Sequence, residues 1–112
     1  MINELTITGT QNNPNNSDYF WMNIDLGDVR VGKVRSKKEA DQLTIYSINI
    51  FPEYERRGIA RNAIQSFKHD YKRIVADRVR YTAIDFWEKM GFSKQPDGNY
   101  LWKKIIKKGP LK

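Results

Sequence analysis

The hydrophobic period of the chain changes between residues 51 and 60, and this change limits the possible folds more than any other feature. Leu43 to Phe51 (LTIYSINIF) is rich in β-branched and aromatic residues, which predicts a central β-strand. Pro52 ends this strand, because proline cannot donate a hydrogen bond to a neighbouring strand. From Gly58 onward, apolar residues recur at spacings of three and four. They predict an amphipathic helix with an apolar face of Ala60, Ile64, Phe67, Tyr71 and Ile74.

The N-terminal part of the chain favours strands. Apolar and polar residues alternate over residues 5–7, as in a half-buried strand. Residues 11–17 (QNNPNNS) predict a turn, because Asn, Pro and Ser favour turn geometry. Alternation resumes over residues 19–26 and again over residues 29–34, and Gly27-Asp28 between them predicts a β-hairpin.

The C-terminal part predicts a short strand, a helix and a last strand. Ile74 to Val79 favours the short strand, and Thr82 to Asp85 resembles a capping box that would begin the helix. Gly91 suits the left-handed residue that ends many helices. Pro96-Asp-Gly98 predicts a turn before a strand over Tyr100 to Ile106. One face of the predicted helix holds Ala83, Phe86, Trp87 and Met90.

These segments predict a single domain over residues 1–112, of the α+β or mixed three-layer class. No apolar run approaches the ~20 residues of a membrane span, and the N-terminus lacks the features of a signal peptide. The chain has no cysteine, which excludes disulfides and thiolate chemistry. We therefore expect a cytoplasmic protein that needs neither membrane nor metal.

Positive charge is concentrated in two places. The net charge is +7 and the pI is near 9.7. The C-terminal tail, about residues 103–112, carries five lysines and no acid. Such a tail is either a solvated chain end or a contact for nucleic acid or another polyanion. The second cluster consists of Arg56, Arg57 and Arg61.

The segment from Ile48 to Arg61 (INIFPEYERRGIAR) has the features of a phosphate site. The first amides of a helix lack intrahelical acceptors, and the helix dipole adds positive charge there, so a phosphate can bind them directly. Gly58 would let a ligand approach the backbone closely, and Ala60 keeps the next turn slim. The nearby arginines can offset the ligand's charge.

Two motifs in this part of the sequence resemble the GNAT superfamily of N-acetyltransferases. Ile50 to Ala60 (IFPEYERRGIA) is similar to the superfamily's cofactor signature, in which a strand passes through a proline into a glycine at a helix start. Ala83 to Phe92 (AIDFWEKMGF) is similar to its later helix, which ends in Gly-Phe. The resemblance covers residues 43–92, whereas residues 1–42 match only as strands. It implies a mixed, mostly antiparallel twisted sheet with two main helices, without the superfamily's usual N-terminal helices.

The resemblance also implies that acetyl-CoA is the cosubstrate of an N-acetyltransferase. Its pantetheine arm would lie along the backbone of Ile48, Asn49 and Ile50. The acetyl group would sit between the central strand and the next one. The pyrophosphate would meet the amides of residues 56–61, which are Arg56, Arg57, Gly58, Ile59, Ala60 and Arg61.

The sequence departs from the superfamily where proton transfer is concerned. Thr44 stands where many members have a glutamate base, and Trp87 stands where a tyrosine often protonates the thiolate. Glu55 replaces the signature's Gln or Arg, and Arg80 replaces an asparagine. We therefore expect direct attack by a neutral, well-placed amine, with no side chain dominating proton transfer.

Tyr46 is the candidate catalytic residue. It follows Thr44 by two positions, so the two side chains of a regular strand would share one face, and Tyr46 could orient the amine or relay its proton. The alternative is a strand tyrosine packed in the core.

Two further functions stay open at the level of sequence. The fold could serve as a non-catalytic module that binds coenzyme A, or as a basic module that binds nucleic acid or protein. In the second case Tyr19 and Trp21 would lie near Lys33 on an exposed sheet. The acceptor of an active enzyme could be a protein or a small molecule, and the positive charge favours an acidic macromolecule.

Overall fold

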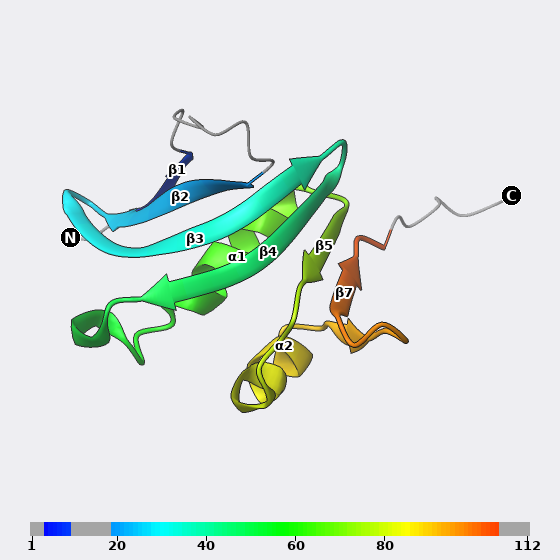
Figure 1. Ribbon diagram of the computed structural model, residues 1–112. Helices are drawn as coiled ribbons and strands as arrows, with labels where there is room; N and C mark the ends of the chain where they lie inside the picture. Colours follow the sequence, from blue (N-terminus) through cyan, green and yellow to red (C-terminus); the bar gives the residue numbers. More distant parts are fainter. Residues whose placement is uncertain (1–3, 10–18, 106–112) are drawn as a thin grey trace, which may run out of the picture.

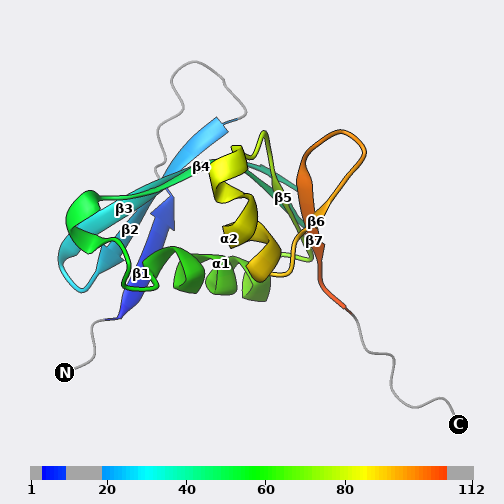
Figure 2. The same cartoon turned by 90° about the horizontal axis from the view of Figure 1, so that it is seen from below.

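The computed structural model describes residues 4–9 and 19–105, which form one mixed sheet and two α-helices (Figures 1 and 2). The strand order is β1-β2-β3-β4-β5-β7-β6. Every pair is antiparallel except β4 and β5, which are parallel. The strands are β1 (Leu5–Gly9), β2 (Tyr19–Leu26), β3 (Val29–Glu39), β4 (Gln42–Ile50), β5 (Arg73–Ala76), β6 (Ser93–Lys94) and β7 (Tyr100–Lys103).

Helix α1 (Ile59–Asp70) connects the two parallel strands and covers one face of the sheet. Such a crossover is what a parallel pair requires, because a tight turn cannot return the chain to the same end of the sheet. Ile64 and Phe67 of the predicted apolar face are buried in α1, together with Ile59 and Ala63, so the predicted helix is confirmed. The rest of the predicted face is wrong, because Ala60 is only half-buried, Tyr71 follows the last helical residue and Ile74 lies in β5. In Figure 1, α1 lies behind β3 and β4.

Helix α2 (Ile84–Lys89) lies past the end of β5, and a 3₁₀ turn (Tyr81–Ala83) precedes it. Gly91 has a φ of 91° and its N–H donates to the Glu88 carbonyl, while the Phe92 N–H donates to the Trp87 carbonyl. These two bonds form a Schellman motif, so the predicted glycine cap is confirmed. The Lys68 ammonium of α1 donates to the Met90 carbonyl, which fastens α2 to α1.

The predicted capping box at Thr82 is wrong. Thr82 lies inside the 3₁₀ turn, and neither the turn nor α2 has a side-chain cap. A backbone hydrogen bond closes this turn instead: the Ala83 N–H donates to the Arg80 carbonyl, so the Thr82 side chain does not cap it.

Three predicted strand ends were also misplaced. β3 continues through the charged residues 35–39, because β2 and β4 pair with it on both sides. β5 ends at Ala76 rather than Val79, where it parts from β4, and β7 ends at Lys103 rather than Ile106. Strand β6 was not predicted. The predicted turn over residues 11–17 and residues 106–112 of the basic tail lie outside the described residues.

The core lies between the sheet and α1 and continues beneath α2. Met22, Val34 and Ile45 are among the buried sheet residues, and Trp87, Met90 and Phe92 add the α2 region. In the described ranges, the sheet face turned away from α1 carries no helix (Figure 1). None of the helices described here is both long and apolar enough to cross a membrane.

Candidate functional site

The parallel strands β4 and β5 part at the centre of the sheet. Their last pair is Ile45 and Ala76, followed by one hydrogen bond of 2.9 Å from the Asp77 N–H to the Ile45 carbonyl. A cavity of about 390 Å³ opens beyond this point, between residues 45–49 and residues 76–80. The carboxyl-terminal half of β4 and the carboxyl end of β5 thus face one cavity, and ligands bind beyond the carboxyl ends of strands in many α/β sheets.

Tyr46 occupies a β-bulge at the mouth of this cavity. Ser36 of β3 pairs with Ile45 and Arg35 pairs with Ser47, so Tyr46 is the extra residue. The bulge shifts the alternation of β4 by one residue, because a strand keeps its faces only while pairing is regular. The shared face with Thr44 therefore does not follow from alternation alone and stays a prediction for Tyr46. Its side chain borders the 390 Å³ cavity and also a smaller one of about 190 Å³.

A second large cavity, of about 470 Å³, lies between the end of β4 and the start of α1. It shares Ile48 and Asn49 with the first cavity, so the two cavities adjoin along β4. It brings together the predicted cofactor-binding residues Ile48, Asn49, Ile50, Arg56, Gly58, Ile59, Ala60 and Arg61. Arg57 is the exception, since it does not line the cavity; its guanidinium lies 5.6 Å from the Tyr54 ring centroid. Glu55 also lines the cavity, so an acid does stand beside the predicted phosphate site.

The start of α1 exposes helix amides toward this cavity. The first hydrogen bond of the helix runs from the Asn62 N–H to the Gly58 carbonyl, so the amides of Ile59, Ala60 and Arg61 precede the helical ladder. Gly58 is left-handed, with φ of 75° and ψ of 14°. A Cβ built on it would meet no atom within 4 Å, so the backbone is open to a ligand. The amides and the dipole together suit an anion.

Asp77 is the residue at the site that sequence reasoning missed. It lines both the 390 Å³ and the 190 Å³ cavity beside Tyr46, and its side chain is 18% exposed. Its Oδ2 lies 3.5 Å from Nε of Arg78, whose own side chain is 91% exposed. The sequence does contain a signal for it, since Asp77 is an acid directly after the apolar residues of β5. A residue at that position lies at the carboxyl end of a strand, where ligands bind in many α/β sheets.

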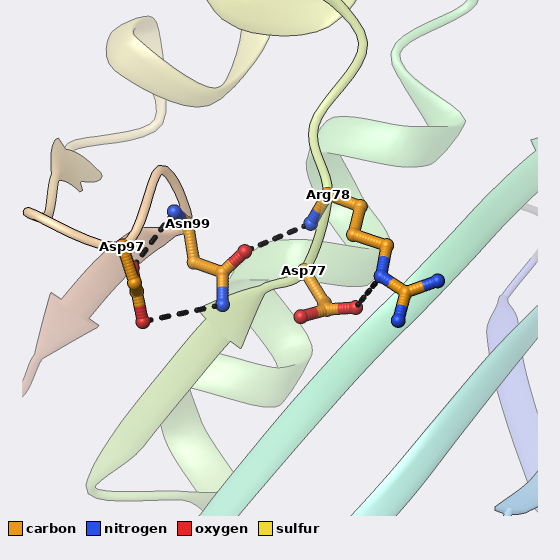
Figure 3. Close-up of polar contacts among 4 residues, drawn as sticks. All are labelled: Asp77, Arg78, Asp97 and Asn99. Atoms are coloured by element: carbon orange, nitrogen blue, oxygen red, sulfur yellow. Dashed lines mark hydrogen bonds and ion pairs between the residues drawn. The ribbon is translucent and has the colours of Figure 1, made fainter.

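The loop that carries Asp77 is held in place by the β6–β7 turn (Figure 3). Arg78 is left-handed, with φ of 52°, a conformation that costs a non-glycine residue free energy. Its N–H donates to Oδ1 of Asn99 at 3.0 Å, and the Asn99 N–H donates to Asp97 at 2.9 Å. This network fixes the direction in which the chain leaves β5, and with it the position of Asp77.

Thr44 and Trp87, which stand at the superfamily's usual base and acid positions, are both buried. Thr44 is buried, lines none of these three cavities, and its hydroxyl accepts a hydrogen bond of 3.0 Å from Gln42. Trp87 is 5% exposed and packs edge-to-face on Phe86 and Phe92. Trp87 does line the 390 Å³ cavity, so it forms part of the wall.

Comparisons with known proteins agree with this geometry. The model of the acetyltransferase (GNAT) family matches residues 4–92. No curated protein matches the sequence significantly.

Solved structures share the fold. An acetyltransferase from Thermus thermophilus has a TM-score of 0.60 at 21% identity, over 80% of this chain and 67% of its own. The Bacillus subtilis N-acetyltransferase YlbP, in complex with coenzyme A, has a TM-score of 0.61 at 18% identity, over 75% and 67%. A GNAT family acetyltransferase from Elizabethkingia anophelis with acetyl-CoA bound has a TM-score of 0.57 at 15% identity, over 81% and 77%.

At such low identities these likenesses show the fold, and they confirm the predicted mixed, mostly antiparallel sheet with two helices. The family match covers most of the chain and includes the segments that form the two cavities. The predicted family and enzyme class are thereby confirmed: the chain belongs to the acetyltransferase (GNAT) family.

Proposed function

We propose that this protein transfers the acetyl group of acetyl-CoA to an amine by direct attack on the thioester. The observation that carries the proposal is that the two cavities share Ile48 and Asn49 and so lie next to each other along β4. One end offers the amides of α1 for an anion, and the other offers Tyr46 and Asp77 at the parting of β4 and β5. Coenzyme A and acetyl-CoA are bound in two of the structures that share this fold, which supports the same cosubstrate here.

The residues around the larger cavity fit the cosubstrate's chemistry. The pyrophosphate would accept hydrogen bonds from the amides of Ile59, Ala60 and Arg61, with the Arg56 and Arg61 side chains nearby to offset its charge. Residues 48–50 would hold the pantetheine amides through their backbone. Bound this way, acetyl-CoA supplies an activated acyl group at the parting of the strands.

Asp77 and Tyr46 would then handle the amine. An acceptor arrives mostly as an ammonium ion, and the Asp77 carboxylate can bind it and accept its proton, a role that replaces the expectation that no side chain dominates proton transfer. The neutral nitrogen attacks the thioester carbon to form the new C–N bond and then loses its second proton to solvent. The C–S bond breaks to release the coenzyme A thiolate, which takes up a proton from solvent. Tyr46 borders both cavities and is placed to orient the nitrogen, so it keeps its predicted role as a proposal. We place this activity in the cytoplasm, because the chain has no cysteine.

A thiol-release assay tests the proposal directly. The protein has no cysteine, so every thiol that appears during turnover comes from coenzyme A. Acetyl-CoA should be incubated with a polyamine, a lysine peptide and a peptide with a free α-amine, and the products examined by mass spectrometry. We expect thiol release matched by acetylation of at least one acceptor. Acetyl-CoA binding in calorimetry without transfer to any acceptor would instead favour the non-catalytic coenzyme A-binding module, and absence of binding would contradict both.

A further inference from the structure

Strand β3 carries a row of three cations on the sheet face opposite α1. Residues 32, 34 and 36 are buried toward the core, whereas Lys33, Arg35 and Lys37 alternate with them and project from the other face. We call these three residues the basic row. No helix covers this face within residues 4–9 and 19–105 (Figure 1).

The cross-strand neighbours of the basic row are neutral. The Lys33 ammonium lies 4.7 Å from the Trp21 ring centroid, and the Lys37 ammonium lies 3.8 Å from a carboxylate oxygen of Glu39 at the end of the strand. The row is therefore a strip of positive charge bordered by polar and aromatic groups. Its described neighbours are Trp21 and Asn23 on β2, and Thr44, Ser47 and Asn49 on β4.

The basic row adjoins the amine end of the candidate site. Arg35 lines the 190 Å³ cavity together with Tyr46, Asp77 and Arg78. Asp77 follows β5, which is two strands away from β3 in the sheet. Two strand spacings amount to roughly 10 Å, a distance that an extended peptide covers in about three residues.

We propose that the basic row binds an acidic, extended segment of a polypeptide acceptor whose amine enters the cavity at Asp77. The inference rests on the proposed function, because the segment is located relative to the amine. Alternate side chains of an extended peptide project to one side about 7 Å apart, the same repeat as the three cations of the row. A peptide that crosses from Asp77 to β3 in about three residues and then runs along this strand would therefore place carboxylates at about its third and fifth positions, opposite Arg35 and one neighbouring lysine.

A polypeptide suits this surface better than a single-stranded nucleic acid. Nucleic-acid binding of that kind needs open aromatic faces on which bases can stack. The Trp21 ring on this face already has the Lys33 ammonium over it. Carboxylates, in contrast, can bind to the three cations of the basic row without an open aromatic face.

The test compares two short peptides with a free α-amine and a C-terminal fluorescent label. One has glutamate at the third and fifth positions, and the other has glutamine there. Affinities are measured by fluorescence anisotropy for the parent protein and two double variants that each lose two positive charges. Lys33→Gln with Lys37→Gln removes part of the basic row. Lys72→Gln with Lys94→Gln is the matched control, because both lysines are exposed and lie outside β3.

We expect the parent to bind the glutamate peptide about fivefold more tightly, the effect of two exposed ion pairs, with the preference declining in high salt. The basic-row variant should reduce the preference to about twofold, because Arg35 still provides one ion pair, and the control should keep the full preference. Equal affinity of the parent for both peptides, or the same loss in both variants, overturns the proposal. Tighter binding of an oligodeoxythymidylate that is lost only in the basic-row variant also overturns it, and assigns the row to nucleic acid. The assay contains no acetyl-CoA, so its outcome is independent of the thiol-release test.

Discussion

Gly58 combines a left-handed backbone with open space in front of it, and both properties matter for the cofactor. Its φ of 75° disfavours any side chain, and a Cβ there would project into the space that we assign to the pyrophosphate. Gly98, in the turn before β7, has a φ of 90° and equally open surroundings. Substitutions at Gly58 and Gly98 can therefore distinguish the effect of backbone strain from the effect of losing the ligand site.

We expect Gly58→Ala and Gly98→Ala to destabilise the fold by similar amounts, about 1 kcal/mol each. Only Gly58→Ala should weaken acetyl-CoA binding, by tenfold or more, a change of about 1.4 kcal/mol. Calorimetric titration checks the affinities and thermal unfolding checks the stabilities. Equal affinities in the two variants would mean that the pyrophosphate binds elsewhere.

Asp77 and Tyr46 lead to a prediction about proton transfer. Asp77→Asn removes the proposed proton acceptor, so kcat/KM should fall by about a hundredfold, and the deficit should shrink as rising pH deprotonates the amine beforehand. Tyr46→Phe should cost at most about one to two powers of ten, because tyrosine only orients or relays. Asp85→Asn is the control, since Asp85 is exposed on α2 and pairs only with Lys89 among the ion pairs described. pH–rate profiles of the parent and the three variants provide the measurement. An unchanged profile in Asp77→Asn would remove Asp77 from the mechanism.

At the scale of elements, the sequence predicted the strands and helices better than their ends and faces. The change of hydrophobic period at Pro52 located β4 and α1, because the spacing of apolar residues depends on whether a strand or a helix buries one of its faces. The bulge at Tyr46 could not be predicted, since it arises from pairing with β3, and it interrupts the regular alternation between Thr44 and Tyr46. The extension of β3 through charged residues likewise depends on partners distant in sequence. Asp77 became a candidate only once the parting of β4 and β5 was known.

Helix α2 is short, and a contact from α1 fastens its C-terminal end. The Lys68 ammonium donates to the Met90 carbonyl and lies 5.3 Å from the Trp102 ring centroid, and burial lowers its pKa. It therefore joins both helices to β7 through a partly desolvated charge.

Lys68→Met should lower the free energy of unfolding by about 1.5 to 3 kcal/mol, the range for a hydrogen bond to a charged group. Lys72→Met should cost less than about 1 kcal/mol, because Lys72 makes a surface ion pair with Asp41 at 3.8 Å. Urea denaturation of both variants measures the two losses in the free energy of unfolding. Equal costs would show that the contact with Met90 does not hold α2 in place.

For the whole molecule, a ligand that bridges β4, α1 and α2 should stabilise the fold. Acetyl-CoA at a hundredfold excess over its Kd would add about 2.7 kcal/mol, which corresponds to a rise in Tm of about 10 °C for a domain of this size. Pantetheine alone lacks the pyrophosphate and should raise Tm less. A melting temperature unaffected by acetyl-CoA at low salt would count against the entire assignment.

The parting of β4 from β5 also creates a strand edge in the interior of a sheet. Beyond Ile45, β4 remains paired with β3 on one side, while its other side has no strand partner among the described residues. Edges of this kind attract strands from other chains and so favour aggregation. The bulge at Tyr46 and the net charge of +7 both oppose such pairing. A pantetheine arm along residues 48–50 would work as a removable strand that closes this edge, so the supply of cofactor would govern the protein's resistance to aggregation as well as its activity.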